Sequence, residues 1–307
     1  MHQGKLLVYI AFVLSLLGCN TITPNCIVDS INWSHRFGVD YDIAYGTSVS
    51  QTLDIYRQGA WHGPPDYFVP HTGSRPTLIY IHGGAWHGGS KAASVWSIMP
   101  FVQRGWTVVN IEYTTGAGTA PQGADDVHLA MQWLVKNAKR YAIDLNNIVV
   151  SGDSAGGHLA LLAGFINAVP KHAAYTGDEM TVKAVINWFG VADIAQLDTY
   201  LESTGNWNYP RAWAKDDVTF ERLVKQYSPI RYVNSLTPSV LSIHGSSDEV
   251  VPIEQTARLH KVLDEFAVPN QVTIIPDGRH LGFTDGQFQT IYRDIFAFLE
   301  SVDIPNP

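Results

Sequence analysis

Cysteine is nearly absent from this chain, which has only Cys19 and Cys26 among its 307 residues. Both lie near the N-terminus, so the body of the chain has no disulfide framework and no metal site of the usual Cys/His spacing. Basic residues are also few, with 20 Lys and Arg against 28 Asp and Glu and a formal net charge of −8. No basic stretch is interleaved with aromatic residues, which argues against nucleic acid as a partner.

Hydrophobic residues, by contrast, make up 46% of the chain. A chain of this length and composition can bury a large core, and one domain of this size is ordinary. No internal repeat or low-complexity tract is present. The length and composition therefore predict one globular domain that follows an N-terminal targeting segment.

Residues 1–18 have the features of a bacterial export signal, because Lys5 precedes an apolar run over 6–17 that is too short to span a bilayer comfortably. The run ends in Leu-Leu-Gly-Cys, which resembles the lipoprotein cleavage box; that resemblance implies cleavage before Cys19 and lipidation of its thiol. Plain secretion with a Cys19–Cys26 disulfide, or an uncleaved anchor, are the alternatives. We expect an exported protein, with any membrane contact made through this anchor and residues 19–33 serving as a linker.

From residue 34 to 302 the pattern predicts one α/β domain. Alternating residues at 41–46 and 51–56 indicate an antiparallel hairpin, and Gly- and Pro-rich residues 59–76 indicate a surface loop. The remaining elements alternate, which predicts a mostly parallel sheet covered by helices on both faces. Strands are expected at 77–81, 106–111, 148–150, 182–188, 239–244 and 271–275, helices at 125–139, 159–164, 253–266 and 288–299, and an aromatic-rich lid insertion at about 193–235.

The most informative stretch is Gly152-Asp153-Ser154-Ala155-Gly156, which connects a buried strand to a helix. This is a G-x-S-x-G motif in the strand–turn–helix context that gives it meaning. Glycines beside the serine allow strand and helix to approach closely around a strained turn. The sequence therefore predicts Ser154 as a nucleophile at the carboxyl end of the sheet; the alternative is a simple tight turn.

A serine nucleophile needs a base and a carboxylate that orients the base. His280 follows the last predicted strand, at the edge where the serine turn also emerges, and is the expected base. Asp248 follows the preceding strand and is the expected acid, with Glu249 and Asp193 as rivals that could instead be solvated or cap a helix. The order serine, acid, histidine is typical of α/β-hydrolases.

The oxyanion formed by such a serine needs backbone N–H donors. Gly83 and Gly84, in His82-Gly83-Gly84-Ala85-Trp86, allow the main chain to approach a substrate oxygen, and Ala155 follows the nucleophile. We expect these three residues to form a three-donor oxyanion hole. His82 is expected to brace the loop rather than react.

Together, the HGGAW, GDSAGG and HGSSD stretches resemble the α/β-hydrolase superfamily over residues 41–299. The closest branch is the carboxylesterases related to hormone-sensitive lipase and to the bacterial esterase and feruloyl-esterase-like (BD-FAE) group. Two departures are Ala85 in place of a third glycine and Tyr-Thr-Thr-Gly-Ala-Gly over 113–118 in place of Tyr-Arg-Leu-Ala-Pro. The resemblance implies hydrolysis of carboxylic esters through an acyl-enzyme, with no metal or organic cofactor.

The motifs indicate less about the substrate than about the reaction. A small ester with a short acyl, acetyl or aryl group, including acyl groups on polysaccharide, fits an exported enzyme with an aromatic-rich mouth. Residues expected to line the pocket, or else to pack the lid, are Trp86, Trp207, Tyr209 and Trp213. The alternatives are an amide hydrolase of the arylformamidase or peptidase type with the same triad, and a surface lipoprotein that binds a ligand without turnover.

Overall fold

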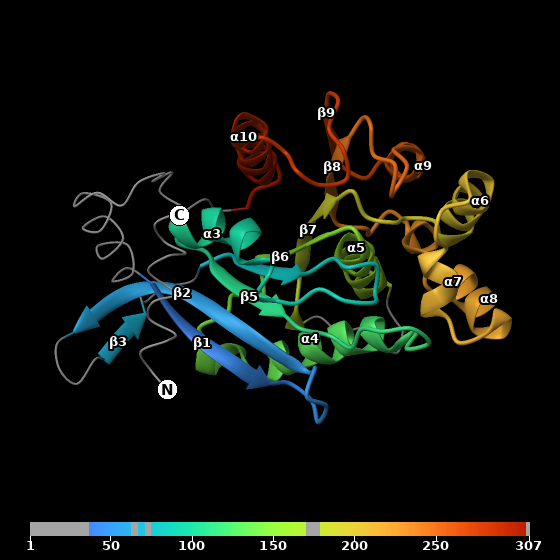
Figure 1. Cartoon of the computed structure of the whole chain (residues 1–307). Coiled ribbons are helices and arrows are strands. Elements are labelled where there is room, and N and C mark those ends of the chain that lie inside the picture. Colours follow the sequence, from blue (N-terminus) through green and yellow to red (C-terminus); the bar gives the residue numbers. More distant parts are fainter. Residues whose placement is uncertain (1–36, 63–66, 71–74, 170–178, 305–307) are drawn as a thin grey trace, which may run out of the picture.

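A computed structural model of the chain describes residues 37–62, 67–70, 75–169 and 179–304. The predicted signal peptide, the linker and both cysteines lie outside these residues. Within the described part, nine strands form a single sheet (Figure 1). Its order is β1-β2-β5-β4-β6-β7-β8-β9, with β3 paired to β2.

The first three strands are antiparallel. β1 (Phe37–Ala44) pairs with β2 (Thr52–His62), which confirms the predicted hairpin, and β2 pairs antiparallel with β5 (Thr107–Ile111). The loop predicted over 59–76 is partly wrong, because β2 extends to His62 and β3 (Tyr67–Pro70) pairs with it. Glycine and proline are concentrated between the two strands, whereas the flanking residues are mainly aromatic or β-branched and suit a sheet.

The other strands are parallel, as predicted: β4 (Thr77–Ile81), β5, β6 (Ile148–Asp153), β7 (Val182–Trp188), β8 (Ser239–Gly245) and β9 (Asn270–Ile275). Alternate residues of these strands enter separate cores. Ile79 and Val150 belong to one core, whereas Leu78 and Val149 belong to the other. Each face is therefore covered, which explains the continuous apolar runs in the sequence.

Helices α4 (Gln122–Tyr141), α5 (Ala155–Asn167) and α9 (Glu254–Glu265) supply the first core. Helices α3 (Val95–Gln103) and α10 (Asp285–Ser301) supply the second, on the opposite face (Figure 1). The sequence reading missed α3. Its residues are apolar on all sides and include Pro100, so they have no clear helical period.

Between β7 and β8 the chain forms three helices and a turn. These are α6 (Ile194–Thr204), α7 (Tyr209–Trp213), α8 (Asp217–Gln226) and the 3-10 turn η2 (Pro229–Tyr232). Figure 1 shows α6, α7 and α8 gathered at one end of the molecule, on the side away from β1–β3. This segment matches the region in which the sequence reading placed the lid insertion.

Candidate active site

Ser154 lies in a strained turn between β6 and α5. Its φ and ψ angles are 53° and −118°, a conformation that a residue with a side chain rarely adopts. A Cβ atom on Gly152 would lie 2.4 Å from the Gly156 carbonyl oxygen, and one on Gly156 would lie 2.1 Å from the Ile81 oxygen. Both glycines are therefore required by close backbone approach, as the motif predicts, and the turn presents Ser154 at the N-terminus of α5.

His280 and Asp248 extend from Ser154 in a continuous hydrogen-bonded chain. Asp248 Oδ2 lies 2.7 Å from His280 Nδ1, and His280 Nε2 lies 2.9 Å from Ser154 Oγ. Because the carboxylate can only accept, Nδ1 carries the hydrogen and Nε2 is left to accept from the serine hydroxyl. The structure therefore brings all three residues predicted for the triad into contact, although they lie far apart in the sequence.

The Asp248 carboxylate is fixed by four neighbours in a buried position. Oδ1 accepts from the N–H groups of Val250 and Val251 at 2.9 Å each, and Oδ2 lies 3.3 Å from His244 Nε2 as well as facing His280. Burial alone would raise the pKa of Asp248, but the hydrogen bonds from His244 and His280 outweigh it and hold the pKa well below its usual range. Asp248 is thus an ionised acceptor.

Sequence reading did not assign a role to His244, four residues before Asp248. Its Nε2 also lies 2.8 Å from the Val251 carbonyl oxygen, and its Nδ1 lies 2.8 Å from Thr256 Oγ1. Both partners of Nε2 are acceptors, so this nitrogen carries a hydrogen that the Val251 carbonyl oxygen and Asp248 Oδ2 share. His244 is the first residue of the HGSSD stretch that the sequence analysis identified. Its contact with the Asp248 carboxylate could be seen only in the folded structure.

The two rival acids lie elsewhere. Asp193 is the N-cap of α6, where Oδ1 accepts from the N–H groups of Ala195 and Gln196, and Oδ2 pairs with Arg258. Glu249 is exposed at the surface. Asp193 therefore has the helix-cap role that was the alternative to catalysis, and no hydrogen bond from either residue to His280 occurs within the described residues.

The predicted three-donor oxyanion hole needs one correction. The Gly83 N–H donates to Asp153 Oδ1 at 3.1 Å, and Tyr80 Oη donates to the same oxygen at 2.9 Å. Gly83 is consequently engaged in holding the loop. In the described part of the chain no acceptor is found for the N–H groups of Gly84 and Ala155, which leaves two donors beside Ser154. Gly84 has a φ of +125°, which only glycine adopts readily.

His82 braces this loop, as predicted. Its Nδ1 lies 2.7 Å from the Gly83 carbonyl oxygen and its Nε2 lies 2.8 Å from Glu112 Oε1. Its ring stacks on Tyr113 with centroids 4.3 Å apart, and Tyr113 Oη donates to the His82 carbonyl oxygen. Burial alone would raise the pKa of Glu112, but the hydrogen bond from His82 outweighs it and lowers the pKa. The oxyanion loop is therefore fixed before any substrate binds.

A cavity of about 300 Å³ opens beside these residues. Asp153 and Leu281, the sequence neighbours of Ser154 and His280, contribute to its wall together with Gly83 and Gly84. The rest of its lining combines serine hydroxyls with aromatic rings, from residues that include Ser90, Ser94, Ser97, Trp188, Phe189, Phe283 and Phe288. Such a space suits a small group with both apolar and polar parts.

None of the four aromatic residues predicted for the pocket lines this cavity. Trp86 and Trp213 are fully buried and stack with centroids 4.8 Å apart, and Tyr209 packs beside them. Trp207 is 61% exposed and contacts His87. The first three therefore pack the insertion onto the body of the domain, which was the alternative reading, because large rings are buried wherever space allows.

Phe189, which the sequence reading also missed, contacts the triad directly. Its ring lies 4.6 Å from the His280 ring, centroid to centroid, and it lines the cavity. It directly follows β7, so its place at the carboxyl edge of the sheet was available from the strand prediction. Its contact with His280 was not, since this depends on an unusual φ of 41°.

The described residues contain no cluster of three or more His, Cys, Asp or Glu side chains with the geometry to hold a metal ion. Among them, every helix is too short or too polar to span a bilayer. The lipidation predicted for Cys19 lies outside the described residues.

Several relatives of this chain are named as esterases. The esterase LipC of Mycobacterium tuberculosis is 30% identical over 69% of this chain and 52% of LipC. LipQ, an esterase of the same organism, is 31% identical over 78% of this chain and 56% of LipQ. The chain thus spans about half the length of the curated relatives it matches.

Solved structures give the same fold. A truncated carbohydrate esterase from gut microbiota is 27% identical, with a TM-score of 0.70 over 87% of this chain and 97% of that chain. Esterase 2 of Thermogutta terrifontis, with bound butyrate, is 21% identical and superposes with a TM-score of 0.67 over 88% of this chain and 95% of its own. These neighbours confirm the predicted α/β-hydrolase fold. The BD-FAE family model matches residues 66–263, well over half of the sequence, and this chain therefore belongs to the BD-FAE family.

Proposed function

We propose that this protein hydrolyses carboxylic esters through an acyl-enzyme on Ser154. The observation that carries the proposal is the continuous chain from Asp248 through His280 to Ser154, with the serine held in a strained turn at a helix N-terminus. The family and the esterase relatives support the same activity.

In the first half-reaction, Ser154 Oγ attacks the ester carbonyl carbon and its proton passes to His280 Nε2. The imidazolium formed is stabilised by Asp248, which remains ionised. When the tetrahedral intermediate collapses, the bond to the alcohol oxygen breaks and His280 returns the proton to that oxygen. The alcohol leaves, and the acyl group remains on Ser154.

Negative charge on the carbonyl oxygen is stabilised by the Gly84 and Ala155 N–H groups and by the N-terminus of α5. Each such donor contributes roughly 3 kcal/mol to transition-state stabilisation in enzymes where one has been removed. Water then attacks the acyl carbon and gives a proton to His280; the bond between the acyl carbon and Ser154 Oγ breaks, His280 returns the proton to Oγ, and the carboxylic acid leaves. No step calls for a metal or organic cofactor.

A short acyl group is the substrate class that we propose, because the cavity of about 300 Å³ lined by Gly83, Gly84 and Asp153 is small and partly polar. Acetyl or aryl esters carried on a polysaccharide fit this size. The carbohydrate esterase from gut microbiota supports that choice, and so does the similarity to a bifunctional protein of Bacteroides eggerthii described as GH43-CE, 26% identical with a TM-score of 0.65 over 84% of this chain.

We also propose that the protein is exported and anchored by lipid on Cys19. A Cys19→Ala variant should move from the membrane fraction to the soluble fraction of the expressing cells. A variant that stayed with the membranes would rule the lipid anchor out.

The activity is tested with p-nitrophenyl acetate, butyrate, octanoate and laurate, on the whole chain and its Ser154→Ala variant. We expect turnover of acetate and butyrate, falling with longer chains, and loss of all turnover in the variant. An anilide of the same acyl group serves as the comparison. Turnover of the anilide but not of the esters would favour the amide-hydrolase alternative.

A further inference from the structure

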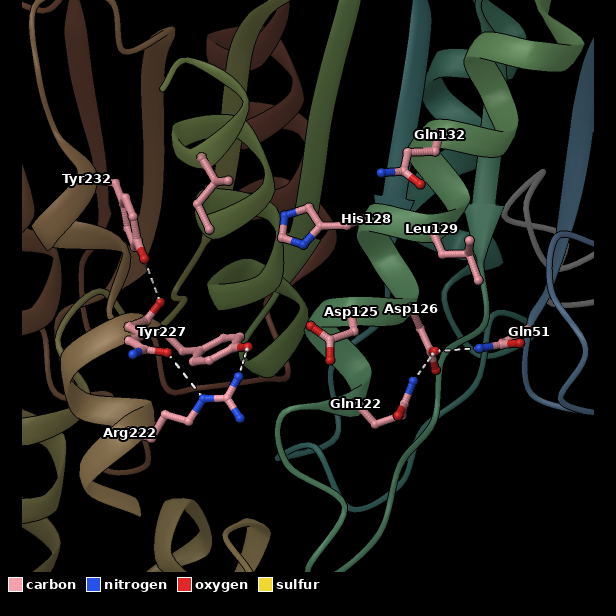
Figure 2. A pocket seen from close by; sticks show the side chains of 12 residues that line it. Gln51, Gln122, Asp125, Asp126, His128, Leu129, Gln132, Arg222, Tyr227 and Tyr232 are labelled. Atoms are coloured by element: carbon pink, nitrogen blue, oxygen red, sulfur yellow. Dashed lines mark hydrogen bonds between the residues drawn. The ribbon is translucent and has the colours of Figure 1, made fainter. Parts of the chain in front are cut away.

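A second and larger cavity, of about 590 Å³, lies outside the catalytic site (Figure 2). One wall is the N-terminal half of α4, and the other is the end of α8 with the turn that follows. Its lining is mostly polar side chains rather than the aliphatic residues of a packing defect. Its volume falls within the roughly 300–1,000 Å³ range of small-molecule sites.

The α4 wall is held in place by a buried carboxylate. Asp126 accepts from Gln122 Nε2 at 2.8 Å and from Gln51 Nε2 at 2.7 Å, and its other oxygen accepts from the Thr114 N–H. Asp126 is therefore satisfied within the protein. Figure 2 shows Asp125 and Gln132 on the same helix directed toward the open space. Within the described residues the Gln132 amide has no protein hydrogen-bond partner.

The opposite wall is ordered around Arg222. Its Nε donates to Gln226 Oε1 at 3.1 Å, and one terminal nitrogen donates to Tyr227 Oη at 3.4 Å. Tyr232 Oη donates to the Gln226 carbonyl oxygen at 2.8 Å. The guanidinium thus faces the α4 wall from a fixed position, with the ring of Tyr227 beside it (Figure 2).

The chemistry of this lining selects a neutral ligand. One guanidinium faces two carboxylates, so the cavity has no excess of positive charge for a phosphate or sulfate. Asp126 already accepts three hydrogen bonds within the protein, and the described residues hold no cluster of three or more His, Cys, Asp or Glu side chains that could bind a metal ion. What is left are amide, carboxylate and guanidinium groups with paired donors and acceptors, the His128 imidazole, tyrosine rings and the apolar Leu129 and Ile166. Vicinal hydroxyls on a largely apolar ring match such groups.

We propose that this cavity binds a neutral oligosaccharide, namely a segment of the polysaccharide whose acyl groups Ser154 removes. The inference rests on the proposed function for the link between the two sites. Both walls belong to the body that carries the active site. On the α8 side, the Tyr227 carbonyl oxygen lies 2.7 Å from His158 Nε2, and His158 is one helical turn after Ser154. On the α4 side, the Gly116 N–H in the loop before that helix donates to the carbonyl oxygen of Trp86, which follows the oxyanion loop.

Binding of one chain at two places would raise the local concentration of its ester groups near Ser154 without any change in the chemistry. A polymeric ester should therefore have a lower KM than a small ester that cannot reach the cavity. Loss of the cavity should raise KM for the polymer and leave turnover of the small ester unchanged.

The test measures saccharide binding by calorimetry in the whole chain with Ser154→Ala, which prevents turnover. Xylotetraose, cellotetraose and mannotetraose are the probes, and inorganic phosphate is the anionic comparison. We expect saturable binding of at least one tetrasaccharide and about tenfold weaker binding after Arg222→Ala or Gln132→Ala, the loss typical of one or two hydrogen bonds. Lys225→Ala on α8 and Lys136→Ala on α4 are the matched controls and should bind as the parent does.

Activity assays with Ser154 present separate the two proposals. The Arg222→Ala variant should hydrolyse p-nitrophenyl acetate at the parent rate while its KM for acetylated xylan rises. The cavity proposal is overturned if none of the tetrasaccharides binds at millimolar concentration, if phosphate binds in their place, or if the cavity variants bind as well as the controls. Failure of the parent to hydrolyse any ester would count against the proposed activity alone.

Discussion

The hydrogen bonds of the Asp248 carboxylate determine which nitrogen of His280 carries the hydrogen. Two backbone N–H groups occupy one carboxylate oxygen, and His244 and His280 share the other. This arrangement fixes the position of the hydrogen on His280 and leaves Nε2 facing Ser154. A group that cannot accept at Oδ2 would stabilise the wrong tautomer.

Replacing Asp248 with Asn should therefore lower kcat for p-nitrophenyl acetate by about 10⁴-fold, the scale found when a triad acid is replaced by its amide. Glu249→Gln is the matched control, one residue away and exposed, and should retain activity close to that of the parent. Steady-state kinetics on both variants measure the effect. Similar losses in the two would mean that Asp248 is not the acid.

The sequence was sufficient to predict Ser154, Asp248 and His280, because each follows a strand at the same edge of a parallel sheet. It was not sufficient for Gly83. Whether a backbone N–H points at a substrate or at a neighbour depends on local torsion angles, and here Asp153 captures it. Asp153 directly precedes the nucleophile in the sequence, but no motif predicted a role for it. Its carboxylate is buried, and burial raises its pKa.

At the scale of elements, the insertion over α6–α8 is attached to the body by a small aromatic cluster. Trp213 at the end of α7 stacks on Trp86, which follows the oxyanion loop, and Trp86 Nε1 donates to His158 Nδ1 at 3.3 Å. His158 in turn contacts the Tyr227 carbonyl oxygen at the end of α8. The insertion is thus packed onto the oxyanion loop and α5, rather than free to swing as a separate lid.

Truncation of Trp213 should accordingly destabilise the whole domain. We expect Trp213→Ala to lower the free energy of unfolding by roughly 3–5 kcal/mol, the usual range for a buried aromatic residue. Trp207→Ala removes the same side chain from an exposed position and should change it by no more than about 0.5 kcal/mol. Urea unfolding gives both values, and equal effects would contradict the assigned packing.

The aromatic content of this insertion was visible in the sequence, but which rings face the substrate was not. Trp207 and Trp213 are six residues apart and differ in exposure from 61% to 0%. Composition cannot separate them, because their burial depends on how α7 meets Trp86. The helix α3 and the strand β3 were missed for a related reason: neither shows the period expected of its type.

At the scale of the whole molecule, His158 makes stability depend on pH. Burial lowers its pKa from 6.5 to about 4, so the folded protein holds it neutral. An unfolded chain protonates this histidine as pH falls below its ordinary pKa, whereas the folded chain does so only near pH 4. The unfolded state therefore binds more protons in this window, and stability falls as pH is lowered through it.

The contribution amounts to about 3 kcal/mol between pH 6.5 and pH 4, taken from the shift to about 4 and 1.36 kcal/mol per pKa unit. His158→Gln, which keeps an acceptor and a donor at the site, should flatten the fall in unfolding free energy over this window. Asp248 acts in the same direction, but only at more acidic pH, because its folded pKa lies below its unfolded one. Urea unfolding at pH 7 and near pH 4.5 tests this, and an unchanged slope in the variant would contradict it.

The proposed role of Ser154 as the nucleophile can be measured by covalent trapping. The whole chain is treated with paraoxon, and the modified residue is located by peptide mass spectrometry while hydrolysis of p-nitrophenyl acetate is followed. We expect one diethylphosphoryl group on Ser154, formed in step with loss of activity and absent from Ser154→Ala. A modified residue other than Ser154, or ester turnover that persists with Ser154 fully modified, would contradict it.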